Sequence, residues 1–381
     1  MNPSRPPLQT AQRSVARPDA PQRILIVNPF GIGDVLFTTP LIRAVRRAFP
    51  DSRIGYLCNR RTEWILQDNP HLNELFIYEK DELVQRWRAS QWEGMRYLIR
   101  LFRQIARGRF DLVIDLSLGE RYGLLLKLLG VPRRVGFNYR RRGHFLTESL
   151  SILGYHDEHI VDYYRRLLRF IGVRLEEPSL ELRVSVEDAQ WAAQWLREHQ
   201  LEGKRPVVGM VPAGGVSWGV GAPFRRWSYE GFAKVGDTLI EQWDAQVILF
   251  GEAMDAAACQ AVAQLMHHPT IDVSGQTTLG QFVSLLTRLS LVLCNDGGPL
   301  HLAVSQGVKT VSIFGPVNPN VYGPYPRTPR HRVVYREELT CRPCYHQFRL
   351  PPCPYERACL NTLPAEQVLE ACEALLAGDR S

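Results

Sequence analysis

Two acidic residues beside glycine-rich turns are the strongest candidates for chemistry in this sequence. Asp34 ends the run PFGIGD (29–34), which follows the apolar segment 24–28 and precedes a stretch with helical spacing. This place predicts a carboxylate at the carboxyl end of a strand, where it could accept a proton from an attacking hydroxyl. A helix-start residue stabilised by the helix dipole is the simpler alternative, and Asp34 by itself fits both interpretations.

Asp296 lies in the second such turn, NDGGPLH (295–301), again between a strand-like and a helix-like segment. Its two glycines allow backbone amides to face an anion, and the N-terminus of a helix favours a diphosphate. His301 falls in the first helical turn, where its ring could donate a hydrogen bond to a phosphate oxygen. An ordinary Asp-Gly turn with a satisfied histidine is the alternative for this run.

A third glycine-containing loop, PAGGVSW (212–218), leads into the run FRRW (224–227). Arg225 comes just before the next helical segment, and its fork of donors suits a diphosphate. The loop therefore predicts another part of an anion site. Trp227 is better explained as a core residue.

Strand-like and helix-like segments alternate along the chain, which indicates a parallel α/β architecture. The alternation begins near residue 23 and restarts at 205, after a linker at 172–182, so the sequence predicts two similar halves. The longest helix is expected somewhere in 81–107, and an amphipathic helix (364–376) closes the chain. The expected strands are 24–28, 53–57, 74–78, 110–116, 134–137, 205–211, 245–251, 291–295 and 309–315.

The overall composition is that of an average globular protein, with 45% of the 381 residues hydrophobic and 22% charged. Collagen-like and wholly disordered chains are excluded, and no apolar run approaches the ~18 residues of a membrane helix. The first 22 residues are rich in Pro, Gln and Arg without an apolar run, so we expect a disordered tail and no secretory signal. These features predict a cytoplasmic protein.

Basic residues outnumber acidic ones by 46 to 39, and only five of the 46 are lysine. Arginines gather at 133–142 and at 165–169, and such patches attract nucleic acids, anionic lipid head groups or acidic substrates. Genomic base composition is an alternative explanation for the arginine excess. No nucleic-acid recognition motif accompanies the patches, so nucleic-acid binding is disfavoured.

A dinucleotide cofactor is also disfavoured at the first turn. The full fingerprint would need a third glycine at position 36, which is Leu36. Asp34 would place a second negative charge where a pyrophosphate binds. An NAD-dependent oxidoreductase is therefore the weaker interpretation.

Five segments in this order resemble glycosyltransferase family 9, the lipopolysaccharide heptosyltransferases. The resemblance spans about residues 23 to 376 and implies a GT-B fold, with two Rossmann-like domains facing across a cleft. It also implies inverting sugar transfer without a metal. The segments are RILIVNPFGIGDVLFTTPLIRAVRRAFPDSRI (23–54), FDLVIDLSLG (110–119), FRRWSYEGFAKV (224–235), VILFGEAMD (247–255) and LCNDGGPLHLAVSQGVKTVSIFGP (293–316).

The same resemblance implies domains and residue roles. It predicts a tail (1–22), an acceptor-binding domain (23–175) and a nucleotide-sugar-binding domain (176–381). Asp34 matches the general base, and Arg225 stands where the family usually has Lys, against the donor phosphates. The donor side is expected to include Gly214, Ser217, Glu252, Asp296, Gly297, Gly298, Pro299, Leu300 and His301, and the acceptor side Gly33, Arg60, Arg61, Arg121 and Arg140.

The resemblance thus implies a transferase that moves heptose from ADP-heptose onto an anionic, lipopolysaccharide-type glycolipid at the inner membrane surface, with no catalytic cofactor. Gly297 replaces the Ser or Thr common in the family, which leaves another nucleotide sugar of cell-surface glycan synthesis as an alternative. A non-catalytic sugar-nucleotide-binding scaffold is a further alternative. The intact Asp34, Asp296 and His301 argue against the scaffold.

Four of the eight cysteines form a cluster near the C-terminus, in a loop at 341–359. Its CxxC beginning is typical of zinc sites, and a structural zinc is the favoured interpretation. Unliganded thiols or a redox-labile pair are the alternatives, because a stable disulfide is less expected in the cytoplasm. The spacing is Cys341-x2-Cys344-x8-Cys353-x5-Cys359.

Overall fold

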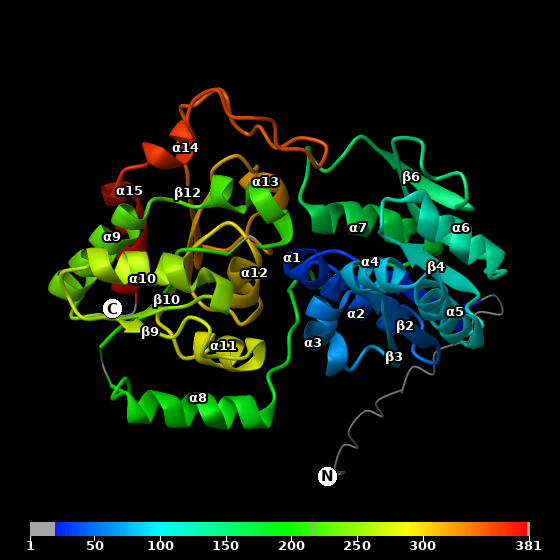
Figure 1. Cartoon of the computed structure of the whole chain (residues 1–381), viewed down its shortest axis with the longest axis horizontal. Helices are drawn as coiled ribbons and strands as arrows, with labels where there is room; N and C mark the ends of the chain where they lie inside the picture. The colour runs from blue at the N-terminus through cyan, green and yellow to red at the C-terminus, as the bar shows by residue number, and fades with distance from the viewer. Residues whose placement is uncertain (1–19, 204, 215, 379–381) are drawn as a thin grey trace, which may run out of the picture.

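The computed structural model describes residues 20–203, 205–214 and 216–378. It has two lobes side by side, each built on a six-stranded sheet covered by helices (Figure 1). All strand pairs in both sheets are parallel. This arrangement confirms the predicted α/β architecture with two Rossmann-like halves, the GT-B fold.

The N-terminal sheet has the strand order β3-β2-β1-β4-β5-β6. Its central strand β1 is apolar and buried from Ile24 to Val27, as expected for a parallel strand covered on both faces. The strands are β1 (Arg23–Val27), β2 (Arg53–Cys58), β3 (Glu74–Ile77), β4 (Leu112–Asp115), β5 (Arg133–Tyr139) and β6 (Glu148–Ile152). The helices are α1 (Ile32–Leu36), α2 (Thr39–Ala48), α3 (Arg60–Gln67), α4 (Lys80–Ala89), α5 (Gln91–Arg107), α6 (Glu120–Leu128) and α7 (Ile160–Leu168).

The C-terminal sheet has the order β12-β11-β10-β7-β8-β9. The strands are β7 (Val207–Val211), β8 (Gln246–Leu249), β9 (Ile271–Asp272), β10 (Leu291–Asn295), β11 (Thr310–Ile313) and β12 (His331–Val334). The helices are α8 (Val186–Glu198), α9 (Tyr229–Trp243), α10 (Ala256–Leu265), α11 (Leu279–Leu286), α12 (Gly298–Ser305), α13 (Pro319–Tyr322), α14 (Ala358–Asn361) and α15 (Ala365–Ala377), with 3-10 turns at Arg169–Ile171, Val216–Arg225 and Ala253–Asp255.

The two sheets share one topology, because in each the first strand of the lobe pairs with the fourth: β1 with β4 and β7 with β10. From each of these central pairs, successive strands are added outward in opposite directions across the sheet, so the strand order reverses between the two paired strands. In open α/β sheets, ligands bind beyond the carboxyl ends of the strands at such a reversal. The topology therefore places the turns after β1 and β10, where Asp34 and Asp296 lie, at the two preferred ligand positions.

The lobes also contact each other directly, at the beginning of α7. His159 caps α7 by accepting the Val161 N–H on Nδ1, which leaves Nε2 to donate to the Gly323 carbonyl at 3.1 Å. The Tyr325 ring stacks on His159 with 4.3 Å between ring centroids, and its hydroxyl donates to Asp162 at 3.0 Å. These contacts join the N-terminal lobe to the segment that follows β11.

The chain passes between the lobes through a segment without helix or strand, as the linker prediction expected for 172–182. Arg43 of α2 holds this segment. Its guanidinium donates to the carbonyls of Glu177 and Ser179 at 2.9 and 2.8 Å and pairs with Glu181 at 3.0 Å. The linker is therefore fixed against the N-terminal lobe.

The structure corrects one predicted element and adds others. The helix expected within 81–107 is two helices, because Ser90 adopts an extended conformation and caps α5. The strands β6, β9 and β12 and the helices α8 and α11 lie in segments for which no element was predicted. Among the described residues, no helix is both long and apolar enough to cross a membrane.

Candidate active site

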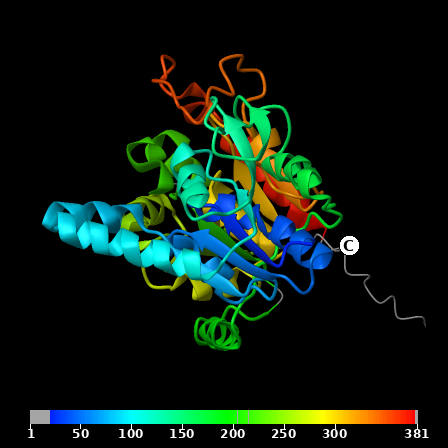
Figure 2. The ribbon, with the colours of Figure 1, turned by 90° about the vertical axis from the view of Figure 1, so that its right-hand side faces the viewer.

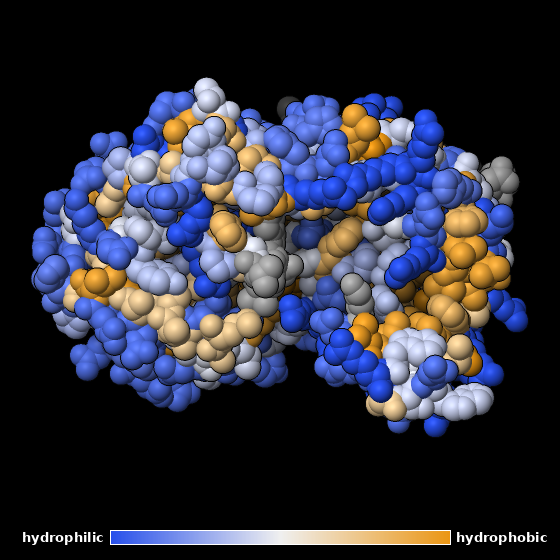
Figure 3. Space-filling view, turned by 45° about the horizontal axis from the view of Figure 1, so that its top comes forward, coloured by the Kyte–Doolittle hydropathy of each residue, from blue (hydrophilic) through white to orange (hydrophobic). Residues whose placement is uncertain are grey.

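A cleft of about 1630 Å³ lies between the lobes, at the carboxyl ends of both sheets. The two lobes and the waist between them are visible in Figure 3. Thirteen of the residues expected at the site line this cleft. They are Gly33, Asp34, Arg61, Arg121 and Arg140 of the N-terminal lobe, and Gly214, Arg225, Glu252, Asp296, Gly297, Gly298, Pro299 and His301 of the C-terminal lobe.

Three expected site residues are not among those that line the cleft. Arg60 is outside the cleft and pairs with Glu63 and Glu82 at 3.6 and 3.9 Å. Leu300 has its side chain buried in the core, so only its backbone could meet a ligand. The side chain of Ser217 lies outside the described part of the chain.

Asp34 sits in the third position of α1, with its carboxylate at the wall of the cleft. Its Oδ2 accepts the Gly31 N–H at 3.2 Å, so the carboxylate also caps the helix. Burial raises the pKa of Asp34 to about 6, although the Gly31 amide and the Arg225 guanidinium both lower it. A carboxyl group with this pKa is ionised at neutral pH and is more basic than an ordinary aspartate.

His301 faces Asp34's helix from the other lobe. Burial lowers the pKa of His301 to about 3, with further lowering by the His159 and Arg225 charges, so the ring is neutral at physiological pH. Its Nδ1 is buried and has no hydrogen-bond partner within the described residues. A buried polar atom of this kind needs a partner, and the cleft is where a ligand could supply one.

Gly33 lies at a close approach between α1 and α12. A Cβ at this position would lie 2.7 Å from Cδ2 of His301, inside van der Waals contact. Gly298 makes the matching approach to Ile32 from the other side, at 3.3 Å. The two turns expected to carry chemistry therefore meet across the cleft, and a side chain at position 33 would need His301 to move.

We expect Gly33→Ala to lower the free energy of unfolding by about 1–3 kcal/mol, because the added methyl group overpacks this contact. Chemical denaturation would measure the loss. Gly378→Ala is the matched control, since the nearest atom that a Cβ there would meet within the described residues is the Leu375 carbonyl oxygen, at 3.7 Å. Equal stability of the two variants would contradict the close approach of α1 and α12.

Arg225 and Asp296 form an ion pair between the loop after β7 and the turn after β10. Both side chains are buried, at 9% and 3% exposure, and the pair lies at the wall of the cleft. Asn295 supports this arrangement by accepting the Trp227 N–H at 2.9 Å and donating to the Pro212 carbonyl at 2.9 Å. Arg225 is thus held in place two residues before a core tryptophan.

A second ion pair, which the sequence did not reveal, shapes the loop at Gly214. Arg226 donates to the Gly214 carbonyl and to Asp255, both at 3.1 Å. Asp255 also accepts the Gly214 N–H at 3.5 Å. Gly214 has a φ of 95°, a region that favours glycine. The two adjacent arginines in FRRW could have indicated this ion pair from the sequence. Arg225 lines the cleft, and Arg226 holds the loop at Gly214.

Several further cleft residues were not among the site residues expected from the sequence. The turn at 345–349, inside the cysteine-containing loop, reaches over to the N-terminal lobe, where Tyr139 donates to the Gln347 carbonyl at 3.0 Å. Arg140 donates to the Gln347 side chain at 3.1 Å. The added residues include Asn59, Tyr78, Tyr122, Arg142, Tyr322, Tyr345, Gln347 and Arg349.

The family model described as glycosyltransferase family 9 (heptosyltransferase) matches residues 98–352, more than half of the chain. This chain belongs to glycosyltransferase family 9. It is an enzyme, a glycosyltransferase.

Individual relatives have low sequence identity to this chain, between 22% and 27% for three of them. Lipopolysaccharide core heptosyltransferase OpsX of Haemophilus influenzae is 23% identical over 323 residues, which cover 84% of this chain and 86% of that protein. A glycosyltransferase family 9 structure from Veillonella parvula aligns with a TM-score of 0.78 at 27% identity, covering 94% of this chain and 98% of that one. The E. coli ADP-heptose lps heptosyltransferase II gives 0.70 at 22% identity, covering 94% and 100%.

The structural zinc expected at the four clustered cysteines of this family 9 glycosyltransferase stays a prediction. No group of three or more His, Cys, Asp or Glu side chains within 20–203, 205–214 and 216–378 is arranged to hold a metal ion. The thiols differ in environment, because Cys341 is exposed and Cys359 is buried. Burial raises the pKa of Cys359 to about 11, and the Cys344, Cys353 and Cys341 thiols raise it further, so the four thiols lie near one another.

Most arginines of the two expected patches are held by partners within the transferase. Arg133 pairs with Glu148 at 2.7 Å, and Arg166 pairs with Glu158 at 2.7 Å. Arg134 donates to the Phe145 carbonyl at 2.6 Å. Only Arg140 and Arg142 of these patches line the cleft.

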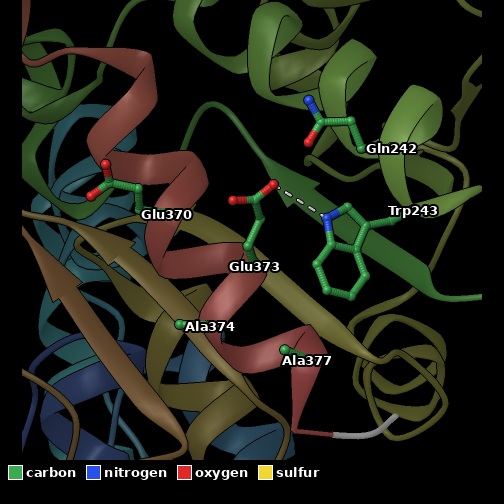
Figure 4. A pocket seen from close by; sticks show the side chains of 6 residues that line it. All are labelled: Gln242, Trp243, Glu370, Glu373, Ala374 and Ala377. Carbon is green, nitrogen blue, oxygen red and sulfur yellow. Dashed lines mark hydrogen bonds between the residues drawn. The ribbon is translucent and has the colours of Figure 1, made fainter.

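A shallow pocket also lies between α9 and α15 (Figure 4). It shares no residue with the cleft. The Trp243 indole donates to Glu373 at 3.3 Å across it, which ties the last helix to the C-terminal lobe. The pocket is therefore part of the packing of α15.

Proposed function

We propose that this glycosyltransferase moves heptose from ADP-heptose onto a lipopolysaccharide core acceptor, with inversion at the anomeric carbon and with Asp34 as the general base. The observation that carries the proposal is the position of Asp34 on one wall of the cleft, opposite Arg225, Asp296 and His301 on the other. The choice of heptose and of ADP rests on the names of the relatives.

The reaction follows from this geometry. A hydroxyl of the acceptor attacks the anomeric carbon from the face opposite the nucleotide, and its proton passes to the Asp34 carboxylate. The bond between the anomeric carbon and the diphosphate breaks, and the electron pair leaves on the diphosphate oxygen. Attack from the opposite face gives the inverted product.

The departing diphosphate gains negative charge, and the C-terminal lobe offers groups that stabilise it. The Arg225 guanidinium is buried at the cleft wall, and the N-terminus of α12, which has no side-chain cap among the described residues, also lies at the cleft wall. A neutral His301 can add a hydrogen bond. Because fixed protein charges and dipoles face the leaving group, we propose a mechanism that does not rely on a metal.

The acceptor side of the cleft is basic. Arg61, Arg121, Arg140 and Arg142 line it on the N-terminal lobe, and Arg349 lines it from the turn of the cysteine-containing loop. Arginine binds phosphate and carboxylate through paired hydrogen bonds. The cleft therefore favours an acceptor that carries phosphates or acidic sugars, as at the cytoplasmic face of the inner membrane.

The transfer rate should depend on pH in a defined direction. Asp34 acts only when ionised, and its pKa is raised to about 6. We expect kcat/KM to be constant above about pH 7 and to fall by about tenfold per unit well below pH 6. Rates measured from pH 4.5 to 8 under conditions where the protein stays folded test this, and a constant rate down to pH 5 would contradict the assignment.

Calorimetric titration with ADP-heptose, ADP, UDP-glucose, GDP-mannose and NAD tests the donor. We expect ADP-heptose to bind most tightly. Preference for another nucleotide sugar would retain the transferase and reject heptose, an outcome made plausible by Gly297, which offers no hydroxyl to the donor. Failure of all five to bind would reject the proposed function.

A further inference from the structure

The helices α4 and α5 form a hairpin that projects from the N-terminal lobe. Figure 2 shows this pair extending away from the rest of the molecule. Only Ser90 separates the two helices, and its side chain accepts the Trp92 N–H at 3.2 Å. Gly94 lets the helices approach closely, because a Cβ there would lie 2.5 Å from the Trp87 ring. The projection is a stiff element with tryptophans beside its tip.

The outward face of this hairpin is unusually apolar. Trp92 is 77% exposed, Met95 43% and Ile99 38%, and their spacing of three and four residues places them along one side of α5. Trp87 and Val84 of α4 are also exposed. The inward residues Gly94, Leu101 and Ile105 are buried, so this apolar face lies opposite the one that packs on the lobe.

Arginines alternate with these apolar side chains. Arg96, Arg100 and Arg103 follow the same outward side of α5 by their spacing and are exposed. None of the three takes part in an ion pair with another described residue. The hairpin as a whole (80–107) has seven basic and three acidic residues. An exposed apolar stripe interleaved with arginine is typical of elements that lie in a membrane interface, and tryptophan favours that interface.

The hairpin is also continuous with the cleft. Leu83 and Val84 of α4 and Leu98 and Phe102 of α5 belong to the cleft lining. The same projection therefore offers apolar side chains both to the outside and to the acceptor half of the cleft. An acceptor with a lipid portion could remain in a bilayer beneath the hairpin while its sugar reaches Asp34.

We propose that the α4–α5 hairpin docks this glycosyltransferase on an anionic phospholipid bilayer, with Trp92, Met95 and Ile99 in the interface and the arginines against the head groups. The idea deepens the proposed function, since it assigns a surface to the membrane that holds the acceptor. A second copy of the chain is a poorer occupant of this surface, because two such hairpins would oppose like charges.

Co-sedimentation with vesicles tests the docking. Vesicles of phosphatidylcholine with 30% phosphatidylglycerol are compared with pure phosphatidylcholine, at low and high salt. We expect strong binding to the anionic vesicles at low salt, weak binding to the neutral ones, and loss of binding at high salt. Equal binding to both kinds of vesicle would overturn the assigned charge contribution.

Two hairpin variants and two controls locate the surface. Replacing Trp92, Met95 and Ile99 with Ser should lower the partition coefficient at least about tenfold. Exchanging Arg96, Arg100 and Arg103 for Glu should lower it by more than about 100-fold, at about fivefold per charge removed. The controls lie on the C-terminal lobe: Val186→Ser, which is 67% exposed, and a triple exchange of the exposed Arg197, Arg288 and Arg332 for Glu.

Binding that falls only in the hairpin variants supports the proposal, and equal losses in the controls overturn it. The same variants should bind ADP and transfer sugar to a deacylated, water-soluble acceptor at the wild-type rate, because none of the changed residues lines the cleft. If wild-type protein binds the vesicles through the hairpin but fails to bind ADP-heptose, the proposed donor is wrong and the docking surface stands.

Discussion

Replacing Asp34 with Asn is expected to lower kcat by about 10³-fold while the affinity for ADP stays within about twofold of wild type. General-base catalysis contributes about 10² to 10⁴ in rate, and an amide cannot take the proton. The amide oxygen can still accept the Gly31 N–H, so α1 keeps its cap. Single-turnover rates and calorimetry separate the two quantities.

The Asp34 variant should also unfold at the same temperature as wild type or higher. Burial raises the pKa of Asp34 from 3.8 to about 6, so the folded protein disfavours the charged form: the free energy of unfolding falls as the pH rises from about 4 to about 6 and stays at the lower level above pH 6. Removing the carboxylate removes that cost. A catalytic loss that accompanied a loss of stability would instead indicate a structural defect.

Asp115 provides the control for this prediction. It is the last residue of β4 and pairs with Val27 of β1, and burial raises its pKa to about 6 as well, so a pH profile alone does not distinguish the two carboxyl groups. Asp115 accepts the Ser117 N–H at 2.9 Å and does not line the cleft. We expect Asp115→Asn to retain turnover. Loss of turnover there, with activity retained in Asp34→Asn, would transfer the role of base to Asp115.

Replacing Arg225 with Met is expected to have the second large effect, on both stability and catalysis. It leaves Asp296 buried without its partner, which typically costs about 3–5 kcal/mol in the free energy of unfolding. It also removes the cation proposed to face the diphosphate, so kcat/KM should fall by about 10²-fold or more. Chemical denaturation and steady-state kinetics measure the two losses.

The double variant Arg225→Met/Asp296→Asn separates these effects. Removing both charges should restore most of the stability, because no uncompensated charge remains. It should not restore kcat/KM, since the leaving group still lacks its cation. Recovery of kcat/KM along with stability would show that Arg225 acts only as the structural partner of Asp296. Arg225→Lys, which keeps the charge, should lose less activity than Met.

The sequence could predict the elements whose patterns are local and strong. β1, β10 and α15 were expected within one or two residues, because apolar runs between glycine turns and amphipathic spacing report burial directly. Strand β9 has only two residues, and β12 follows a proline-rich stretch, so neither has a clear strand pattern in its own sequence. Both are extended because they pair with a neighbouring strand, β9 with β8 and β12 with β11. The break at Ser90 was missed because both flanking segments have helical patterns.

The candidate site was predicted less evenly than the fold. Asp34, Asp296 and His301 were found because each stands beside a glycine turn after a strand, a position that the sequence displays. Arg60, expected on the acceptor side, does not line the cleft. It pairs with Glu63, whereas its neighbour Arg61 lines the cleft, and the spacing of two adjacent arginines does not distinguish them. The turn at 345–349 was missed because its place at the cleft depends on contacts with Tyr139 and Arg140, which are distant in the sequence.

By itself, the sequence determined the α/β class, the two halves and the types of residue available at each turn, since these follow from local burial patterns and from backbone chemistry. Only the tertiary structure decided which of these residues meet: Gly33 against His301, Arg225 paired with Asp296, and a cysteine-containing loop over the N-terminal lobe. The reason is physical. The raised pKa of Asp34 and the buried ion pair arise from desolvation and proximity, which depend on the packing of two lobes distant in sequence.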